Sequence, residues 1–244
     1  GRAGVGVDNI DLQAAKDHGV TVVNAPVATT IAVAELGFGM MFALVRDIPH
    51  TDSEMKHDKW TKKDYKGREL NGKTLGIVGY GNIGSTIGKY AQALGMKVVC
   101  YDPIRNIDEM RASGADPVQL EEVYEKSDII TFHVPLIPET KHMVNDETFT
   151  KMKDGVLLVN VARGGIIEEA ALLRALESGK VAGAALDVYE KEPPVDWTIA
   201  EHPKVIAVPH VGGQTEEAQL RVAGDIASEV MNVLQGNPLR WKIC

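Results

Sequence analysis

Arg163, Glu192 and His210 are charged or titratable side chains that each follow an apolar run of the sequence. The guanidinium of Arg163 can bind a carboxylate through two parallel hydrogen bonds. The imidazole of His210 can pass a proton to or from a substrate oxygen while hydride moves at the adjacent carbon, and Glu192 can hold the imidazolium. Each residue alone is more typical of a solvent-exposed loop. Together, at the ends of consecutive apolar runs, they predict a site that interconverts a 2-hydroxy acid and a 2-oxo acid.

A glycine motif at residues 79–84 predicts a dinucleotide cofactor for this chemistry. Its letters, Gly-Tyr-Gly-Asn-Ile-Gly, match G-x-G-x-x-G and stand between an apolar run and a helical pattern. In such motifs Gly79 permits a tight turn, Gly81 lets the backbone approach a pyrophosphate, and Gly84 lets helix and strand pack closely. The N–H groups at the start of the following helix would bind the anion. The alternative interpretation is a glycine turn with a structural role only.

Asp102 strengthens the cofactor interpretation, because it ends the next apolar run. It lies close to the spacing of about 20 residues at which a carboxylate binds the adenosine ribose. A carboxylate there repels a 2′-phosphate, so NAD is favoured over NADP, although Arg105 is near enough to leave NADP open. Asp187, inside another apolar run, is expected near the nicotinamide carboxamide.

Short β-branched runs alternate with helical patterns from Leu75 onward. The expected strands are apolar along their length, as in a sheet covered on both faces; they are Leu75–Gly79, Lys97–Asp102, Ile129–Val134, Val156–Val161, Ala182–Val188 and Val205–Val208. Helical patterns between them include Gly84–Leu94, Leu120–Glu125 and Glu168–Glu177. The alternation predicts an α/β fold with a doubly wound parallel sheet. Ligands of such sheets bind outside the carboxyl ends of the strands.

Two long helices flank this pattern. One is expected from Thr30 to Asp47, closed by Pro49, and the other from Glu216 to Leu234, closed by a Gly-Asn-Pro sequence. The segment from His50 to Lys73 is polar and rich in Lys and Asp. Its Trp60 is expected to pack either within the chain or against a second subunit.

Composition excludes several functional classes. The 244-residue chain has a formal net charge of -8, which opposes nucleic-acid binding. The most apolar stretch, Ile31–Val45, contains Glu35 and is shorter than the about 20 apolar residues of a membrane span. Cys100 and Cys244 are too few for a disulfide framework and favour a reducing, cytoplasmic compartment. No group of His, Cys, Asp and Glu has metal-ligand spacing, so no metal is expected.

Several segments of the sequence resemble the signatures of the D-isomer-specific 2-hydroxyacid dehydrogenase family. They are Val159–Ile166, Asp187–Pro194 and Pro209–Gly213. Three further segments are similar to the branch of this family that oxidises 3-phosphoglycerate; they are Gly1–Asn9, Glu69–Ile77 and Gln214–Gln219. The resemblance covers essentially the whole chain.

The resemblance implies a Rossmann NAD-binding domain in which Arg163, Glu192 and His210 are the catalytic residues. The implied cofactor contacts are Gly79, Gly81, Asn82, Ile83, Gly84, Asp102, Val134, Pro135, Val161, Ala162, Arg163, Asp187, His210, Gly212 and Gly213. The chain departs from the family pattern in four places: Val5 and Val134 replace a frequent Thr, Asn82 a frequent Arg, and Val161 a frequent Cys or other small residue. These departures remove side-chain hydrogen bonds and one charge from the cofactor site.

The resemblance also implies how the chain divides. Residues 25–213 would form the NAD-binding domain, residues 1–24 a remnant of a substrate domain, and residues 214–244 the returning helix and tail of that domain. In the family, the regions corresponding to the helix at 30–47 and the segment 48–70 lie in a homodimer interface, so a homodimer is expected.

Arg2, Gly4 and Lys62 are the expected substrate-binding residues. Lys62 matches a basic position that reaches the substrate phosphate of the partner subunit, with an ordinary solvated lysine as the alternative. Arg2 matches a substrate-side loop, and the backbone at Gly4 could form an amide nest for a carboxylate.

The resemblance implies NAD-dependent oxidation of 3-phosphoglycerate to 3-phosphohydroxypyruvate at the start of serine synthesis. Two alternatives stay open. The catalytic residues define the reaction and leave the substrate side chain undefined, so a glyoxylate/hydroxypyruvate dehydrogenase or another D-2-hydroxyacid dehydrogenase would carry the same residues. NAD(H)-sensing corepressors share the fold and the residues, so a sensor protein is the second alternative.

Overall fold

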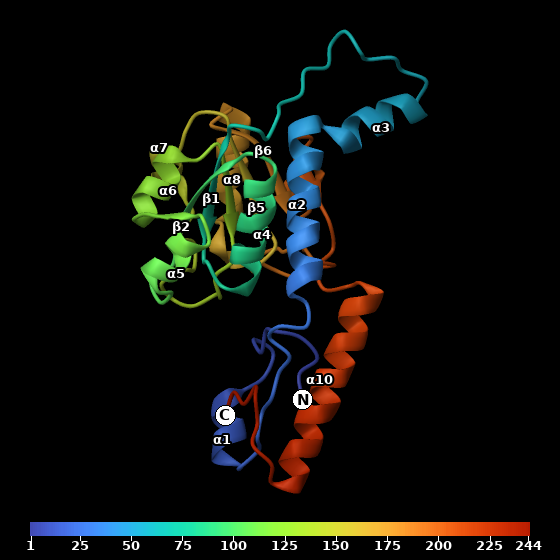
Figure 1. Cartoon of the computed structure of the whole chain (residues 1–244). Coiled ribbons are helices and arrows are strands. Elements are labelled where there is room, and N and C mark those ends of the chain that lie inside the picture. Colours follow the sequence, from blue (N-terminus) through green and yellow to red (C-terminus); the bar gives the residue numbers. More distant parts are fainter. The chain divides into compact units, whose positions relative to one another are not determined.

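A computed structural model describes residues 1–244, which divide into two compact units (Figure 1). The larger unit is Ala34–Val211, and the smaller one combines Gly1–Val33 with Gly212–Cys244. The limits expected from the sequence, residues 25–213 for the NAD-binding domain, stay a prediction. None of the helices has both the length and the apolar composition that crossing a membrane requires.

The larger unit is built on a parallel sheet of seven strands in the order β3-β2-β1-β4-β5-β6-β7. The strands are β1 (Thr74–Val78), β2 (Lys97–Tyr101), β3 (Asp116–Pro117), β4 (Ile129–Phe132), β5 (Val156–Asn160), β6 (Val181–Leu186) and β7 (Val205–Ala207). This order confirms the predicted doubly wound sheet. The strand sequence reverses between β1 and β4, where the ligand crevice of such sheets lies.

Apolar runs form the central strands because helices cover the sheet. Every residue of β4 and β5 is buried. The covering helices are α4 (Asn82–Ala93), α5 (Ile107–Ala112), α6 (Leu120–Lys126), α7 (Asp146–Lys151), α8 (Glu169–Ser178) and α9 (Thr198–Glu201), with the 3₁₀ turn η1 (Gly164–Ile166). All six expected strands are present. The seventh, β3, has two residues and no apolar run, so the sequence pattern did not indicate it.

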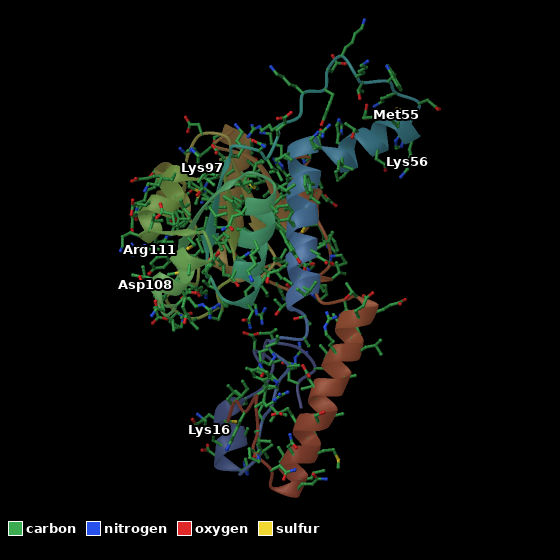
Figure 2. All side chains as sticks on the ribbon, in the orientation of Figure 1. Lys16, Met55, Lys56, Lys97, Asp108 and Arg111 are labelled. Carbon is green, nitrogen blue, oxygen red and sulfur yellow. The ribbon has the colours of Figure 1, made fainter.

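The predicted role of Pro49 was wrong. Helix α2 (Thr30–Arg46) ends before Pro49, and a further helix, α3 (Ile48–Lys56), follows it. Asp47 separates the two helices by taking a left-handed conformation with φ of 47°. Pro49 lies in the first turn of α3, where proline is tolerated because those N–H groups have no intrahelical acceptor. No side chain of α3 is buried within the chain, and Met55 and Lys56 project from its end (Figure 2).

The smaller unit contains helices α1 (Leu12–Asp17) and α10 (Glu216–Gln235). Helix α10 ends, as predicted, where the Gly-Asn-Pro sequence begins. The buried carboxylate of Glu229 on α10 accepts hydrogen bonds from the backbone N–H groups of Arg240 and Trp241, both at 3.0 Å. These bonds hold the C-terminal segment to the helix.

Candidate active site

The imidazole of His210 and the carboxylate of Glu192 form a hydrogen-bonded pair. Glu192 lies in the loop after β6, and His210 follows β7. The distance between Nδ1 of His210 and Oε2 of Glu192 is 2.5 Å. A carboxylate at Nδ1 orients the ring and leaves Nε2 as the nitrogen that can exchange a proton with a substrate. The two residues that sequence analysis paired are therefore in contact.

Tyr189 holds the loop that carries Glu192. Its backbone N–H donates to Oε1 of Glu192 at 3.1 Å. Its phenol donates to the carbonyl oxygens of Leu186 at 3.3 Å and Val208 at 3.2 Å, which connects the ends of β6 and β7. Burial raises the pKa of Tyr189 to about 12, so the phenol stays protonated and remains a donor. Sequence analysis missed this residue. Its only local signal is an aromatic side chain between Asp187 and Glu190.

Asp187 holds the backbone on both sides of the His210 Cα atom. His210 takes a left-handed conformation with φ of 52°, which is uncommon for a non-glycine residue. The backbone N–H of His210 donates to the Asp187 carbonyl at 2.9 Å, and the N–H of Val211 donates to Oδ1 of Asp187 at 2.6 Å. Asp187 is 1% exposed. Its carboxylate thus positions the histidine loop, and its expected contact with the nicotinamide stays a prediction.

Asn160 shapes the turn that carries Arg163. This buried last residue of β5 donates from Nδ2 to the carbonyl oxygen of Arg163 at 2.8 Å. Its Oδ1 accepts from the backbone N–H of Ala162 at 3.1 Å. The guanidinium of Arg163 donates from Nη1 to the carbonyl oxygen of Ala162 at 2.6 Å. The signal in the sequence is an amide at the end of an otherwise apolar strand, and sequence analysis did not use it.

Gly164 brings the turn of Arg163 against the loop of Glu192. A Cβ atom at Gly164 would overlap the carbonyl carbon and oxygen of Tyr189. Only glycine permits this approach between two backbones. Through Tyr189, the structure therefore brings together the three segments that carry Arg163, Glu192 and His210.

The three glycines of the motif meet different surroundings. Gly79 has φ of 90°, and a Cβ there would lie 2.5 Å from the carbonyl oxygen of His133. A Cβ at Gly84 would overlap the carbonyl oxygen of Gly79. At Gly81, by contrast, a Cβ would meet nothing within 4 Å. The protein's own packing requires the first and third glycines, whereas the second faces open space at the start of α4, which fits the approach of a pyrophosphate.

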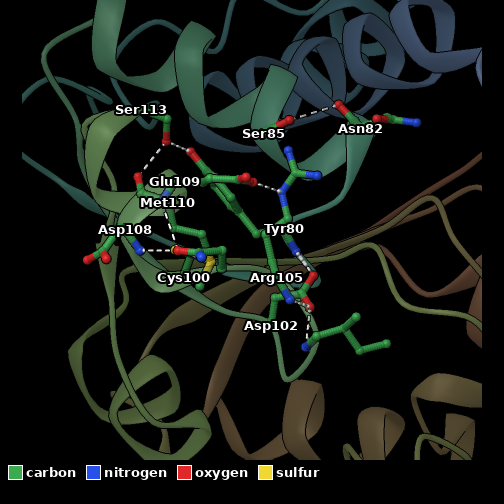
Figure 3. A network of polar contacts seen from close by, with 12 residues as sticks. Tyr80, Asn82, Ser85, Cys100, Asp102, Arg105, Asp108, Glu109, Met110 and Ser113 are labelled. Carbon is green, nitrogen blue, oxygen red and sulfur yellow. Dashed lines mark hydrogen bonds and ion pairs between the residues drawn. The ribbon is translucent and has the colours of Figure 1, made fainter.

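Asp102 connects the glycine loop with the turn after β2 (Figure 3). Its Oδ2 accepts from the backbone N–H of Tyr80 at 2.8 Å. Its Oδ1 accepts from the N–H groups of Ile104 at 2.9 Å and Arg105 at 3.0 Å. A carboxylate oxygen can accept two hydrogen bonds, so Oδ2 retains capacity for a ribose hydroxyl. The carboxylate predicted to bind ribose thus also organises the protein around that site.

Tyr80 anchors the glycine loop through its buried side chain. Its ring is buried, and its phenol shares a hydrogen bond with Oγ of Ser113 at 2.9 Å (Figure 3). Burial raises the pKa of this phenol. A Cβ at Gly88 would lie 2.8 Å from the phenol oxygen, so the ring also packs against α4. Sequence analysis treated Tyr80 as a variable position of the motif and missed this role.

The segment after β4 borders the glycine loop. A Cβ at Gly79 would lie 2.9 Å from Cγ1 of Val134, which places this predicted cofactor contact beside the motif. The ring of His133 contacts Oγ1 of Thr131 through Nε2 at 2.9 Å, while its Nδ1 is shielded from solvent and has no hydrogen-bond partner. Burial lowers the pKa of His133 to about 3, so its imidazole is neutral. Val161, another predicted contact, packs its side chain near Gly37 of α2.

Arg2, Gly4, Gly212 and Gly213 belong to the smaller unit. The guanidinium of Arg2 folds back and donates from Nη1 to the carbonyl oxygen of Ala3. Gly4 has φ of 140°. Their predicted ligand roles remain predictions.

Lys62 lies in the exposed segment after α3. It lines an apolar hollow of about 450 Å³ together with Arg46, Ile48, Thr51, Met55, Trp60, Thr61 and Tyr65. The side chain of Trp60 is 77% exposed. The tryptophan therefore does not pack within the chain.

Comparisons with known proteins point to one family. Residues 38–212 match the family described as "D-isomer specific 2-hydroxyacid dehydrogenase, NAD binding domain". The chain is 53% identical to D-3-phosphoglycerate dehydrogenase of Bacillus subtilis over 98% of this chain and 46% of that protein. It is 48% identical to the Rattus norvegicus protein of the same name over 98% of this chain and 45% of that protein.

Solved structures agree with this similarity. A glyoxylate reductase from Paecilomyes thermophila has a TM-score of 0.92 and 34% identity, covering 99% of this chain and 73% of that one. A D-lactate dehydrogenase from Aquifex aeolicus, complexed with NAD and lactic acid, has a TM-score of 0.89 and 34% identity, covering 96% of this chain and 75% of that one. The chain spans about half the length of the curated relatives it matches.

Proposed function

Because the chain belongs to the D-isomer specific 2-hydroxyacid dehydrogenase family, we propose that it functions as an NAD-dependent enzyme. This enzyme would interconvert a 2-hydroxy acid and a 2-oxo acid. The observation that carries the proposal is the 2.5 Å contact between Nδ1 of His210 and Oε2 of Glu192. A histidine oriented by a carboxylate is the arrangement that proton transfer to a carbonyl oxygen requires. The nearby turn of Arg163 supplies a cation for the substrate carboxylate.

The cofactor would be held by the residues at the β1–β4 crevice. Gly81 and the start of α4 would bind the pyrophosphate, and Asp102 would bind the adenosine ribose. Asp187 would face the nicotinamide carboxamide. When bound, NAD supplies the acceptor for the hydride.

The chain's own residues would perform the remaining steps of the oxidation. Arg163 binds the substrate carboxylate through paired hydrogen bonds and thereby orients the hydroxyl-bearing carbon. Nε2 of His210 takes the hydroxyl proton as the carbon loses its hydride and the C–O bond becomes a carbonyl. Glu192 stabilises the imidazolium that forms. In the reverse direction His210 returns the proton to the carbonyl oxygen.

The substrate that we propose is D-3-phosphoglycerate, oxidised to 3-phosphohydroxypyruvate in serine biosynthesis. The relatives from B. subtilis and rat, named D-3-phosphoglycerate dehydrogenase, are more similar in sequence to this chain than the reductase and lactate dehydrogenase structures are. Lys62, Lys63 and Lys66 add positive charge to an exposed segment of an otherwise acidic chain. That charge supports a phosphorylated substrate, with Lys62 and Arg2 as the proposed anion contacts.

We also propose a homodimer formed through α2, α3 and the following segment to residue 70. The support is apolar surface on this segment, where Ile48, Met55 and Trp60 are all at least half exposed. Desolvating such side chains favours association. A cytoplasmic location is proposed because both cysteines are free thiols.

Substrate preference tests the proposal. The full-length protein is mixed with NADH and, separately, with 3-phosphohydroxypyruvate, hydroxypyruvate, glyoxylate and pyruvate, and loss of nicotinamide absorbance is followed. Fastest turnover of the phosphorylated acid is expected. Comparable rates on the other acids would indicate a general hydroxyacid dehydrogenase, and NADH binding without turnover would indicate a sensor.

Arg163→Ala tests the catalytic assignment in the same assay. The KM for the 2-oxo acid should rise and turnover should fall, while the Kd for NADH stays within about twofold of the wild-type value. Equal losses in substrate and NADH binding would contradict the proposed role of Arg163.

A further inference from the structure

An ion pair stands beside the proposed ribose site, between Arg105 and Glu109. The backbone N–H of Arg105 donates to Oδ1 of Asp102 at 3.0 Å, so Arg105 is fixed to the carboxylate that would bind ribose. Its side chain extends toward α5, where Nε lies 3.6 Å from Oε2 of Glu109 (Figure 3). Glu109 lies in the first turn of α5.

This geometry bears on the difference between the two common nicotinamide dinucleotides. NADP carries a phosphate on the 2′-oxygen of the adenosine ribose, where NAD carries a hydroxyl. Proteins that accept the phosphate place an arginine next to this position, and proteins that reject it place a carboxylate there. The chain has both, in Asp102 and Arg105, so these two side chains alone do not decide the preference.

We propose that Glu109 is a specificity-determining residue, which favours NAD by weakening the binding of NADP. By pairing with Nε of Arg105 it offsets the positive charge of the guanidinium that would otherwise attract a 2′-phosphate. It also adds a second negative charge to that of Asp102, so the three side chains carry a net charge of about -1 toward the ribose. The inference rests on the proposed NAD site and extends it to a residue outside the glycine motif.

The exposure of the pair indicates the size of the effect. The side chain of Arg105 is 44% exposed and that of Glu109 is 65% exposed. Solvent and salt weaken ion pairs at such positions, so a phosphate dianion can compete for the guanidinium once the carboxylate is neutralised. A modest, salt-sensitive change in cofactor preference is therefore expected.

Cofactor binding to Glu109→Gln provides the test. The Kd values of NADH and NADPH are measured by nicotinamide fluorescence on the full-length protein at low and high salt. At low salt, Glu109→Gln should improve NADPH binding relative to NADH by about three- to tenfold, because one charge near the phosphate is removed. High salt should shrink this gain.

Asp108→Asn is the charge-matched control. Asp108 precedes Glu109 in sequence but pairs with Arg111 at 3.8 Å, and both side chains lie on the surface of α5 (Figure 2). This variant should change the NADPH-to-NADH ratio less than about twofold. Adding Arg105→Ala to Glu109→Gln should reduce the gain to the part that comes from the lost negative charge, because the guanidinium is then absent. Thermal unfolding of each variant verifies that the fold is retained.

The outcomes separate this inference from the proposed function. If Glu109→Gln binds NADH but its NADPH-to-NADH ratio is unchanged, the role of Glu109 is overturned and the proposed NAD site still stands. The same holds if Asp108→Asn changes this ratio as much as Glu109→Gln does. Failure of the wild-type protein to bind NADH overturns the proposed cofactor site and this inference with it.

Discussion

Nδ1 of His210 lies 2.5 Å from Oε2 of Glu192, and a single residue, Tyr189, supports both members of the pair. The backbone N–H of Tyr189 holds the other carboxylate oxygen of Glu192, at 3.1 Å. Its phenol reaches the carbonyl of Val208, two positions before the histidine, at 3.2 Å. The imidazole and the carboxylate are therefore positioned before any ligand arrives, which lowers the cost of organising them during the reaction.

Glu192→Gln should lower kcat by about 10²-fold, because a neutral amide cannot stabilise the imidazolium that forms at His210. Steady-state kinetics of the reduction of a 2-oxo acid at neutral pH measure this loss.

Glu190→Gln is the matched control for that prediction. Glu190 lies two positions away and faces His142 at 3.2 Å instead of His210. Its substitution should leave kcat within about twofold of the wild-type value. Equal losses in the two variants would mean that Glu192 supports the loop and does not act through the imidazole.

Gly81→Ala and Gly84→Ala should separate ligand binding from folding. A Cβ at position 81 meets nothing within 4 Å, so the variant should be destabilised by no more than about 1 kcal/mol and should bind NADH at least about tenfold more weakly. A Cβ at position 84 overlaps the carbonyl oxygen of Gly79, which should cost about 2 kcal/mol or more. Denaturant unfolding and NADH titration distinguish them. Unchanged NADH binding in Gly81→Ala would show that the pyrophosphate does not approach this glycine.

The sheet and the proposed catalytic residues could be predicted for the same physical reason. Strands buried on both faces are continuous apolar runs, and a charged or titratable residue shortly after such a run, such as Arg163 or His210, stands out against it. The positioning residues are harder to recognise, since Tyr189 carries no such contrast and the polar end of β5 at Asn160 does not reveal which groups it binds. Asn160 and Tyr189 act through hydrogen bonds to backbone groups, and those partners are defined only once β5, β6 and β7 are side by side.

Helix α3 escaped prediction for a different reason. Its residues are polar and none is buried within the chain, so no apolar periodicity marks it. Pro49 was interpreted as a stop signal because proline disfavours a helix interior, yet the same property suits a first turn. The left-handed conformation of Asp47 ends α2 and allows α3 to begin in a new direction. The sequence carries no reliable signal for this conformation.

Asp102→Ala should both relax the preference for NAD and destabilise the protein. Three backbone N–H groups, of Tyr80, Ile104 and Arg105, would lose their acceptor. We expect a loss of about 1–2 kcal/mol in the free energy of unfolding, measured with urea. Asp102→Asn keeps one acceptor oxygen and should lose less. A fully stable Asp102→Ala variant would show that these bonds do not hold the glycine loop.

His133 should make the protein sensitive to acid. Burial lowers its pKa from 6.5 to about 3, so below pH 6.5 the unfolded chain takes up a proton that the folded chain does not. Stability is thus lost as the pH falls from 6.5 toward 3, by about 2 kcal/mol at pH 5 from this group. Unfolding free energies at pH 7 and pH 5 should therefore differ less in His133→Asn than in the wild type.

An exposed histidine provides the comparison for this measurement. His50 lies on the surface of α3, and His50→Asn should retain the wild-type pH dependence. If His133→Asn and the wild type lost equal stability between the two pH values, the ring of His133 would not be the acid-sensitive group.

The overlap that a side chain at Gly164 would create with Tyr189 has a consequence for protein engineering. The backbone of the turn that carries Arg163 fits closely against the backbone of the loop that carries Glu192. Replacing only one of these segments with that of another dehydrogenase would therefore disturb the contact. A chimaera that exchanges residues 160–166 together with residues 186–192 should retain activity, whereas exchanging either segment by itself should separate the cation from the proton-transfer pair. The two segments therefore have to be exchanged together.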